Sequence, residues 1–249
     1  MKPPQFSQWV GRPWAFVRVS NDTRPTTVIR FVNRQDAEDH LRVLKRFLRN
    51  TPAQFTIVFD LTADPNYWEK CYQENKTPWD LGQAHRAFHT LLETTEIQPG
   101  LTAVLGCGRG YDALLFAEYG FQVIGFDFSP TALTTAKYLA KTSRSSAQFL
   151  QRNIFNLANE FHQDFDYIIE HNCFSAIPSD SRGDYVELVK YLLKEKGELI
   201  GIFLTQNPTS GPPFASTPVE ISHYFQPHFK LLQFEPISES EYLVRFRLR

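Results

Sequence analysis

The sequence has few of the features that mark secreted, metal-binding and membrane-spanning proteins. Its 249 residues include only 3 cysteines, Cys71, Cys107 and Cys173, which lie far apart and form no CxxC pair. This spacing predicts reduced thiols and neither a disulfide framework nor a zinc site. No apolar run approaches the roughly 18 residues of a membrane-spanning helix, and no signal-peptide pattern opens the chain. We therefore expect a cytoplasmic protein with no membrane partner.

An excess of charge of one sign is also missing, because 26 Lys and Arg residues face 27 Asp and Glu residues. This balance disfavours a strongly polyanionic partner for the whole molecule. The charges are nevertheless unevenly distributed, since residues 1–50 hold ten basic and four acidic side chains. Hydrophobic residues make up 42% of the chain, enough for the core of one α/β domain, with or without a small addition.

The first sixty residues predict a small unit of their own. Runs of β-forming residues occur in three places, at 14–19, 26–32 and 55–60. Apolar residues at helical spacing over 36–50 lie between the second and third runs. We assign residues 1–62 to a small basic β-β-α-β module and residues 63–249 to the main domain. The dispersed arginines of the module favour docking on the main domain or self-association over nucleic-acid binding, which generally needs a concentrated basic patch.

Beyond Asp64, apolar strands alternate with helices, which indicates a parallel sheet covered on both faces. The expected strands are at 101–105, 121–127, 147–150, 165–170 and 197–203, and the expected helices start at Asp64-Pro65 and run over 82–94, 111–119, 129–141 and 183–194. After a short helix from Thr217, residues 229–234 and 241–248 predict an antiparallel hairpin at the sheet edge. The predicted fold class is α/β, with a Rossmann-like, seven-stranded, mostly parallel sheet.

Three glycines at alternate positions, Gly106, Gly108 and Gly110, follow the first strand of this series. A dinucleotide fingerprint has the spacing GxGxxG, and its pyrophosphate rests on the helix N-terminus. Here Tyr111 takes the place of the third glycine, so we expect a nucleoside without a pyrophosphate. Asp127 ends the next strand, where a carboxylate can accept hydrogen bonds from both ribose hydroxyls. Together these residues favour S-adenosylmethionine over NAD; the alternative is a tight turn that binds nothing.

Several motifs in a fixed order carry a family resemblance. They are YWEKCYQENKTPWDLGQ at 67–83, LGCGRGYD at 105–112, GFDFSPTAL at 125–133, NCFSAIPSDSR at 172–182 and GPPF at 211–214. In these motifs the chain resembles the thiopurine methyltransferase family, which includes the plant halide and thiol methyltransferases. The resemblance covers residues 64–235 and leaves residues 1–62 without a counterpart. It implies a class I S-adenosylmethionine-dependent methyltransferase.

The resemblance also assigns roles to individual positions. It implies that the cofactor is bound by an aromatic group, the glycine loop and residues at strand ends, namely Trp68, Tyr72, Trp79, Gly106, Gly108, Asp127, Phe128, Asn153, Ile154 and Glu170. Among these, Asn153 and Ile154 are placed beside the adenine. It further implies that Glu170 and His171 face the methyl group and that Arg182 lines the acceptor pocket. These three are the candidate catalytic residues.

The reaction implied by the resemblance is methylation of a small soft nucleophile such as a thiol, hydrosulfide or halide. A soft anion needs no general base, whereas a neutral thiol benefits from one, and His171 has a suitable unperturbed pKa. One alternative is methylation of a larger oxygen, nitrogen or macromolecular acceptor that the N-terminal module recognises. The other alternative is a protein that binds the cofactor without turnover.

Each candidate residue also has a purely structural interpretation. Trp68 and Tyr72 lie four residues apart, as in the buried stripe of a packing helix. His171 can be a loop histidine whose hydrogen bonds are satisfied. His85 and His89 have the i,i+4 spacing of metal ligands, but no third ligand is apparent, and we expect both on a solvated face with no metal.

Overall fold

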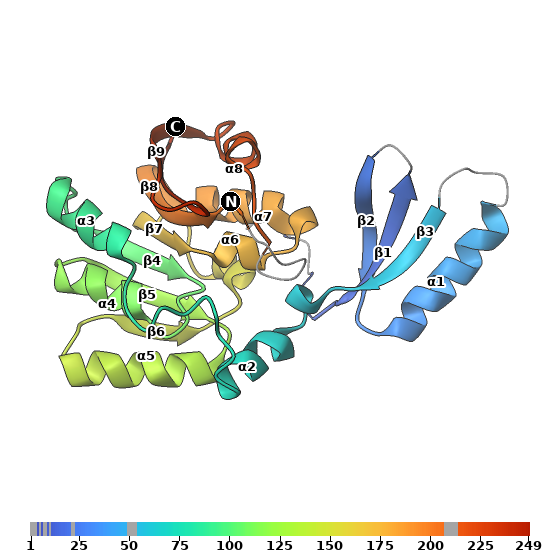
Figure 1. Cartoon of the computed structure of the whole chain (residues 1–249), viewed down its shortest axis with the longest axis horizontal. Coiled ribbons are helices and arrows are strands. Elements are labelled where there is room, and N and C mark those ends of the chain that lie inside the picture. The colour runs from blue at the N-terminus through green and yellow to red at the C-terminus, as the bar shows by residue number, and fades with distance from the viewer. Residues whose placement is uncertain are drawn as a thin grey trace.

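A computed structural model of the chain describes residues 11–20, 23–48, 54–206 and 214–249, together with Pro4, Phe6 and Trp9. These residues form two β-sheets that are separated along the longest axis of the molecule (Figure 1). The segment after β3 runs directly from the smaller sheet into the larger part. None of the helices in the described ranges combines the length and the apolar character that crossing a membrane requires.

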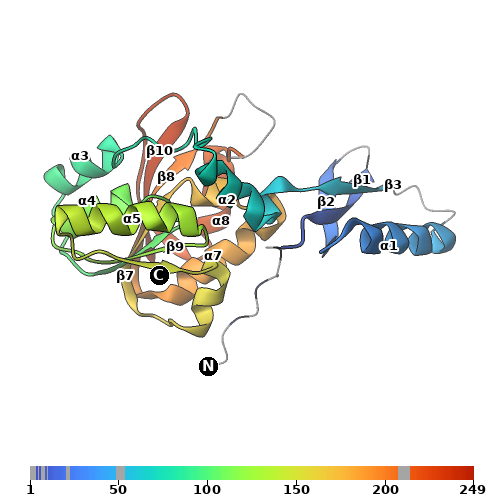
Figure 2. The same cartoon turned by 90° about the horizontal axis from the view of Figure 1, so that it is seen from below.

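The smaller sheet belongs to the N-terminal module, which comprises β1 (Trp14–Ser20), β2 (Thr23–Phe31), α1 (Arg34–Phe47) and β3 (Gln54–Phe59). Its strand order is β2-β1-β3, and β1 pairs antiparallel with both neighbours. The helix covers one face of the sheet (Figure 2), where the ring of Phe16 is fully buried between His40 and Phe55. The predicted β-β-α-β order is confirmed.

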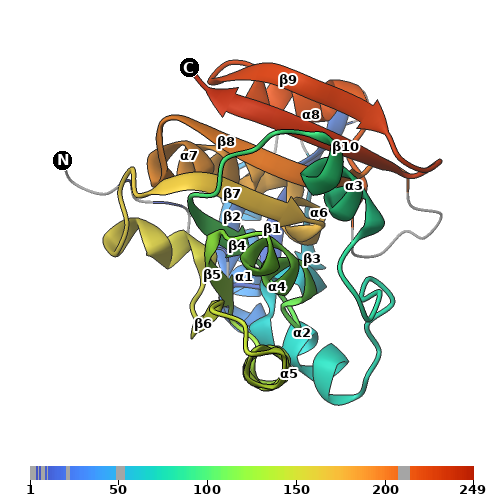
Figure 3. The same ribbon diagram turned by 90° about the vertical axis from the view of Figure 1, so that its left-hand side faces the viewer.

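The larger sheet has the order β6-β5-β4-β7-β8-β10-β9 (Figure 3). Its strands are β4 (Leu101–Leu105), β5 (Gln122–Asp127), β6 (Gln148–Gln151), β7 (Phe165–His171), β8 (Leu193–Leu204), β9 (Phe229–Pro236) and β10 (Glu241–Leu248). The pairs from β6 to β8 are parallel, whereas β10 is antiparallel to both β8 and β9. The Rossmann-like sheet with a C-terminal antiparallel hairpin is therefore confirmed.

Helices pack on both faces of this sheet and beside the carboxyl ends of its strands. They are α2 (Pro65–Gln73), α3 (Arg86–Thr94), α4 (Tyr111–Glu118), α5 (Pro130–Ser143), α6 (Cys173–Ala176), α7 (Arg182–Leu192) and α8 (Pro218–Phe225), with the short 3-10 turns η1 (Leu61–Ala63), η2 (Ile154–Asn159) and η3 (Ser179–Ser181). One apolar core joins the sheet to η2, α6, α7 and α8. A second core joins the opposite face to α3, α4 and α5. The carboxyl ends of the parallel strands lie between these two layers, where α/β proteins bind their ligands.

The helix expected over 82–94 is shorter than predicted and begins at Arg86. The reason is the N-cap, His85, whose Nδ1 accepts a hydrogen bond from the backbone N–H of Ala87 at 3.1 Å. The residues before it form an irregular segment, and the backbone N–H of His85 is bound by a side chain of another helix. Tertiary contacts therefore set this boundary.

Two other boundaries also differ from the predictions. The helix expected over 36–50 ends at Phe47, and Leu48 is its C-cap. The helix expected over 183–194 ends at Leu192, and β8 begins at the next residue instead of at Gly197. The first residue of β8 is still paired, because Leu193 lies opposite Phe165 at the start of β7. The register of the two strands is irregular between Phe165 and Tyr167.

Candidate active site

A cavity lies at the carboxyl ends of β4, β5 and β7. It brings together predicted residues from distant parts of the chain, namely Trp68, Tyr72, Trp79, Gly106, Asp127, Phe128, Asn153, Ile154 and His171. It is also lined by residues to which we had assigned no role, namely Trp9, Phe155, Asn172, Cys173, Ala176 and Ile177. A largely apolar hollow with a few polar groups is the usual form of a small-molecule site.

The glycine loop after β4 forms part of the floor of the cavity, with Gly106 in its lining and Gly108 facing an adjoining hollow. Gly106 has a φ of 63°, and a Cβ placed there would lie 2.9 Å from Sγ of Cys173. Gly108 has a φ of 51°, and its Cβ would lie 2.7 Å from Oη of Tyr72. Side chains at these positions would be strained and would collide with the cavity walls. The loop therefore requires glycine both for its conformation and for its close contacts.

Asp127 ends β5 with its carboxylate at the cavity and only 8% of the residue exposed. Oδ2 accepts a hydrogen bond from the N–H of Gly108 at 2.9 Å, and Oδ1 accepts one from the N–H of Ser129 at 2.9 Å. Burial raises the pKa of this carboxyl above its ordinary value, although the backbone donors oppose that effect. Each oxygen keeps a further lone pair for a ligand donor, so the group can still bind a diol.

An aromatic wall stands opposite the glycine loop. Trp68 and Tyr72 lie on one face of α2, and each is 8% exposed. The indole of Trp79 contacts both rings edge-on, at centroid distances of 5.3 Å and 6.1 Å. Nε1 of Trp68 donates to the backbone carbonyl of Thr62 at 3.1 Å. The two helix residues thus form the packed stripe expected from their spacing, and that stripe faces a cavity.

The segment that carries this wall is held to the rest of the site by polar contacts. Glu69 on α2 accepts hydrogen bonds from the hydroxyls of Ser129, at 2.6 Å, and Thr131, both at the start of α5. Arg109 of the glycine loop pairs with Asp80 at 2.9 Å. These bonds fix the aromatic rings relative to both the glycine loop and the end of β5.

His171 ends β7 and lines the cavity, with 15% of its side chain exposed. Its Nδ1 lies 2.7 Å from Oδ2 of Asp112, in the first turn of α4. Burial lowers the pKa of His171, but the hydrogen bond and charge of Asp112, together with Glu170 and Glu241, outweigh it, so the pKa is raised. Asp112 thereby orients the imidazole of His171, and the second ring nitrogen, Nε2, remains for proton transfer.

Asp112 also connects His171 to His85. Its Oδ1 accepts a hydrogen bond from the backbone N–H of His85 at 2.9 Å, and the two imidazole rings lie 5.3 Å apart. His85 is therefore not on a solvated face, contrary to our expectation, because 14% of its side chain is exposed and Nε2 lies 3.5 Å from Glu241. His89 is exposed, as expected. The described residues contain no group of three His, Cys, Asp or Glu side chains suited to a metal ion.

Glu170 is placed beneath the cavity and not in its lining. Its carboxylate is fully buried, accepts hydrogen bonds from the N–H of Phe174 at 3.0 and 3.1 Å, and accepts one from the hydroxyl of Tyr185 at 2.7 Å. Burial raises its pKa to about 7, against the lowering effect of these donors. The Glu170 carboxylate thus holds the start of α6, which follows His171 in the chain.

Arg182 lies outside this cavity as well. Its guanidinium stands 4.9 Å from the ring centroid of Phe174 and donates to the backbone carbonyl of Phe214 at 2.9 Å. It lines a separate groove between the N-terminal module and the turns before α7 and α8. Of the predicted motif GPPF at 211–214, only Phe214 lies within the described residues.

Some residues of the site were missed by sequence reasoning. Asp112 belongs to the motif LGCGRGYD, but an acid in the first turn of a helix is common because it complements the helix dipole. Asp112 faces a smaller hollow that adjoins the cavity, together with His171 and Gly108, both of which were predicted. Trp9 has no neighbouring motif, so no signal in the sequence could have linked it to the cavity.

These residues fit S-adenosylmethionine. The floor without side chains allows a nucleoside to approach the backbone, the Asp127 carboxylate is available at the end of β5, and aromatic faces stand opposite. Asp127 is the only carboxylate among the described residues that line the cavity. This combination of glycine backbone, carboxylate and aromatic rings is that of a nucleoside site.

Known proteins resemble the chain in sequence and in fold. Residues 63–248 match the thiopurine S-methyltransferase family. A probable thiol methyltransferase 2 of Arabidopsis thaliana is 33% identical over 160 residues, which cover 63% of this chain and 69% of the relative. Thiocyanate methyltransferase 1 of the same plant is 30% identical over 167 residues, which cover 66% and 73%.

The solved structures share the fold at low sequence identity. A 1,6-didemethyltoxoflavin-N1-methyltransferase of Burkholderia thailandensis has a TM-score of 0.62 and 19% identity, with 74% of this chain and 86% of that chain covered. A magnesium protoporphyrin IX methyltransferase of Synechocystis has a TM-score of 0.60 and 15% identity, with 74% and 95% covered. Because the family match spans well over half of the sequence, the chain belongs to the thiopurine S-methyltransferase family and is an S-adenosylmethionine-dependent methyltransferase.

Proposed function

We propose that the protein transfers the methyl group of S-adenosylmethionine to a small soft nucleophile, such as a thiol, hydrosulfide, thiocyanate or halide. The observation that carries this proposal is the position of His171, which is oriented by Asp112 in the same cavity as Asp127 and the glycine loop. The names of the similar plant enzymes, thiol and thiocyanate methyltransferases, support the acceptor class.

The proposed binding mode follows from the lining residues. Asp127, beside Gly106 and Gly108, would hold the ribose, because its two oxygens can accept hydrogen bonds from the ribose hydroxyls. Asn153, Ile154 and Phe128 would hold the adenine. The aromatic wall would face the sulfonium end, where cation–π attraction would contribute ~0.5–2 kcal/mol.

When bound, the cofactor supplies an electrophilic methyl group on a sulfonium that leaves as a neutral thioether. The protein's contribution is mainly alignment of the nucleophile with this methyl group at a contact of ~3–3.5 Å. The apolar rings of Trp68, Tyr72 and Trp79 keep water from the reacting centre, which favours an anionic nucleophile.

His171 serves as the general base for neutral thiols. With its Nδ1–H donated to Asp112, the neutral imidazole presents an unprotonated Nε2. The thiol proton moves to Nε2 as the sulfur–methyl bond forms and the sulfonium–methyl bond breaks. An anionic acceptor uses the same alignment without this proton transfer.

For Glu170 and Arg182 we propose supporting roles instead of direct contact with the reacting atoms. Glu170 fixes the N–H of Phe174 and thereby the turn that carries His171. Arg182 holds Phe214 beside α6 and borders the separate groove next to the N-terminal module. We also keep as proposals a cytoplasmic location, a boundary between residues 62 and 63, and self-association through the N-terminal module rather than nucleic-acid binding.

The test is an assay of the purified protein with labelled S-adenosylmethionine against thiols, thiocyanate, iodide, phenols and a cell extract. We expect labelled product from a thiol or a soft anion, and none from phenols. Label appearing only on oxygen, nitrogen or a macromolecule would contradict the acceptor class. Cofactor binding without turnover on any acceptor would contradict catalysis itself.

A further inference from the structure

One wall of the cofactor cavity comes from outside the part of the chain that matches the family. Trp9 lies far before residue 63, yet its side chain lines the cavity and the residue is only 5% exposed. Its ring meets the ring of Phe155 edge-on at 5.7 Å. Phe155 directly follows Asn153 and Ile154, so Trp9 stands at the end of the cavity where we place the adenine.

The backbone around Trp9 is fixed to the same turn that positions Trp68. The carbonyl of Trp9 accepts the N–H of Arg12 at 2.9 Å, and Gly11 supplies the φ of 79° within this turn. The N–H of Gly11 donates to the carbonyl of Ala63 at 2.8 Å. The preceding carbonyl, of Thr62, accepts the indole N–H of Trp68. Adjacent carbonyls of η1 therefore hold both tryptophans.

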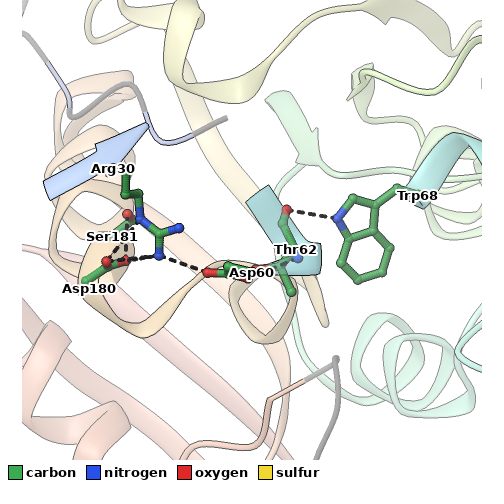
Figure 4. Close-up of polar contacts among 6 residues, drawn as sticks. All are labelled: Arg30, Asp60, Thr62, Trp68, Asp180 and Ser181. Carbon is green, nitrogen blue, oxygen red and sulfur yellow. Dashed lines mark hydrogen bonds and ion pairs between the residues drawn. The ribbon is translucent and has the colours of Figure 1, made fainter. Parts of the chain in front are cut away.

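The N-terminal module holds η1 in turn through Arg30. This guanidinium is 9% exposed and pairs with Asp60 at 2.8 Å and with Asp180 at 2.9 Å (Figure 4). Asp60 accepts hydrogen bonds from the N–H and hydroxyl of Thr62, at 3.0 and 2.6 Å. The chain of contacts runs from the module, through η1, to the cavity wall.

Trp9 also carries an unmet polar group. Its Nε1 is buried and has no hydrogen-bond acceptor among the residues that the structure describes. A buried donor without an acceptor is costly and rare in folded proteins. Trp9 is therefore held at the cavity by its ring contact with Phe155 and not by a hydrogen bond of its indole.

We propose that Trp9 is a cofactor-binding residue whose indole closes the adenine end of the cavity. The inference rests on the proposed function and on the placement of the adenine beside Asn153. It makes the N-terminal module part of the cofactor site, because the module fixes the turn from which Trp9 projects.

The test measures the affinity for S-adenosylhomocysteine by calorimetry in Trp9→Ala, Trp9→Phe and the unaltered protein. We expect Kd to rise about tenfold or more for Trp9→Ala, which loses a large buried surface. We expect a smaller rise, of about fivefold, for Trp9→Phe, which keeps an aromatic ring but loses part of the ring surface. The loss should be the same for 5′-methylthioadenosine, which has the base and ribose but lacks the amino-acid tail.

The matched control is Trp14→Phe, because Trp14 belongs to the same module but packs on Phe59 and Arg34 away from the cavity. This variant should keep the original Kd. An unchanged Kd in both Trp9 variants, with unaltered melting of the ligand-free protein, overturns the proposal. An affinity lost for S-adenosylhomocysteine but kept for 5′-methylthioadenosine also overturns it, because Trp9 would then act on the tail.

A second measurement avoids altering the cavity. In protein labelled with 5-fluorotryptophan, the fluorine resonance of Trp9 should shift with S-adenosylhomocysteine, as those of Trp68 and Trp79 do, while that of Trp14 stays. A fixed Trp9 resonance beside shifting Trp68 and Trp79 resonances overturns this inference alone. No binding of the nucleoside by the unaltered protein would instead contradict the proposed function.

Discussion

Nδ1 of His171 lies 2.7 Å from Oδ2 of Asp112, although 59 residues separate them in the sequence. The contact exists because β7 and β4 are neighbouring parallel strands, so that the end of β7 meets the helix that follows β4. It joins the histidine proposed as general base to a carboxylate that orients it. The pair therefore gives the proposed chemistry its most direct tests.

Replacing His171 should separate neutral from anionic acceptors. His171→Ala is expected to lower turnover of a neutral thiol by about 100-fold near pH 7, because the thiol proton then has no acceptor. Turnover of iodide should change little, since iodide has no proton to lose. Steady-state assays on both acceptors check this, and equal losses would show that the residue shapes the pocket without acting as a base.

Replacing Asp112 should move the pH profile. The Asp112 carboxylate stabilises the imidazolium and raises the pKa of His171, so Asp112→Asn lowers that pKa. Because the base must be neutral, the acidic limb of kcat/KM for a thiol should shift to lower pH. Its plateau should also fall, since the tautomer is less firmly held. An acidic limb at an unchanged pH would mean that a group other than His171 controls it.

Replacing Asp127 should weaken cofactor binding more than folding. Asp127→Asn removes the charge from the hydrogen bonds to the ribose, at a cost on the order of 2–3 kcal/mol in S-adenosylhomocysteine affinity. A folding cost is also expected, because the carboxylate binds the N–H groups of Gly108 and Ser129. Calorimetry and thermal melting separate the two, and an unchanged affinity in the folded variant would contradict the proposed ribose site.

In the unaltered protein, the affinity for S-adenosylhomocysteine should fall at acidic pH as Asp127 takes up a proton. Its pKa is raised by burial, so this fall begins at a higher pH than the ordinary 3.8 of an aspartate would give. The Asp127→Asn variant has no such proton to take up and provides the flat control profile.

Replacing Glu69 should loosen the aromatic wall. Glu69→Gln weakens the bonds to Ser129 and Thr131, and we expect a rise in KM for S-adenosylmethionine of about threefold to tenfold with little change in kcat. Glu74→Gln is the matched control, because Glu74 lies at the end of the same helix and pairs with the exposed Lys76. Equal effects of the two substitutions would rule out a specific contribution of Glu69.

Glu170 should make the ligand-free protein less stable as pH rises. Its pKa is about 7 in the folded chain against an ordinary 4.5, so between these values the folded state holds the extra proton. The free energy of unfolding therefore falls as pH rises from 4.5 to 7, by roughly 3 kcal/mol for this group. Glu170→Gln should flatten this slope in denaturant titrations, whereas Glu160→Gln, an exposed control, should preserve it.

The sequence predicts the contiguous parts of the site well. Asp127 and the glycine loop follow strands whose apolar pattern is plain, and strand order then brings both to one edge of the sheet. The aromatic stripe of Trp68 and Tyr72 follows from helical spacing alone. Local patterns of this kind determine local structure, so these predictions needed no knowledge of the fold.

Residues that act through tertiary contacts were not predictable in this way. Asp112 resembles any acid in the first turn of a helix, and only strand pairing brings His171 to it. His85 reads as a surface residue until β10 places Glu241 beside it. Glu170 and Arg182 lie next to the predicted site in sequence, but their side chains point beneath it or toward a neighbouring groove.

The bridge from Arg30 to both Asp60 and Asp180 has a consequence for how the protein unfolds. Local melting of the N-terminal module would leave the partly buried carboxylate of Asp180 without its cation, and such a state is costly. The module and the seven-stranded part are therefore expected to lose their structure in one cooperative transition, even though the match to the family begins only at residue 63. We expect the chain to behave thermodynamically as a single unit, so that cofactor binding stabilises the module and the seven-stranded part together.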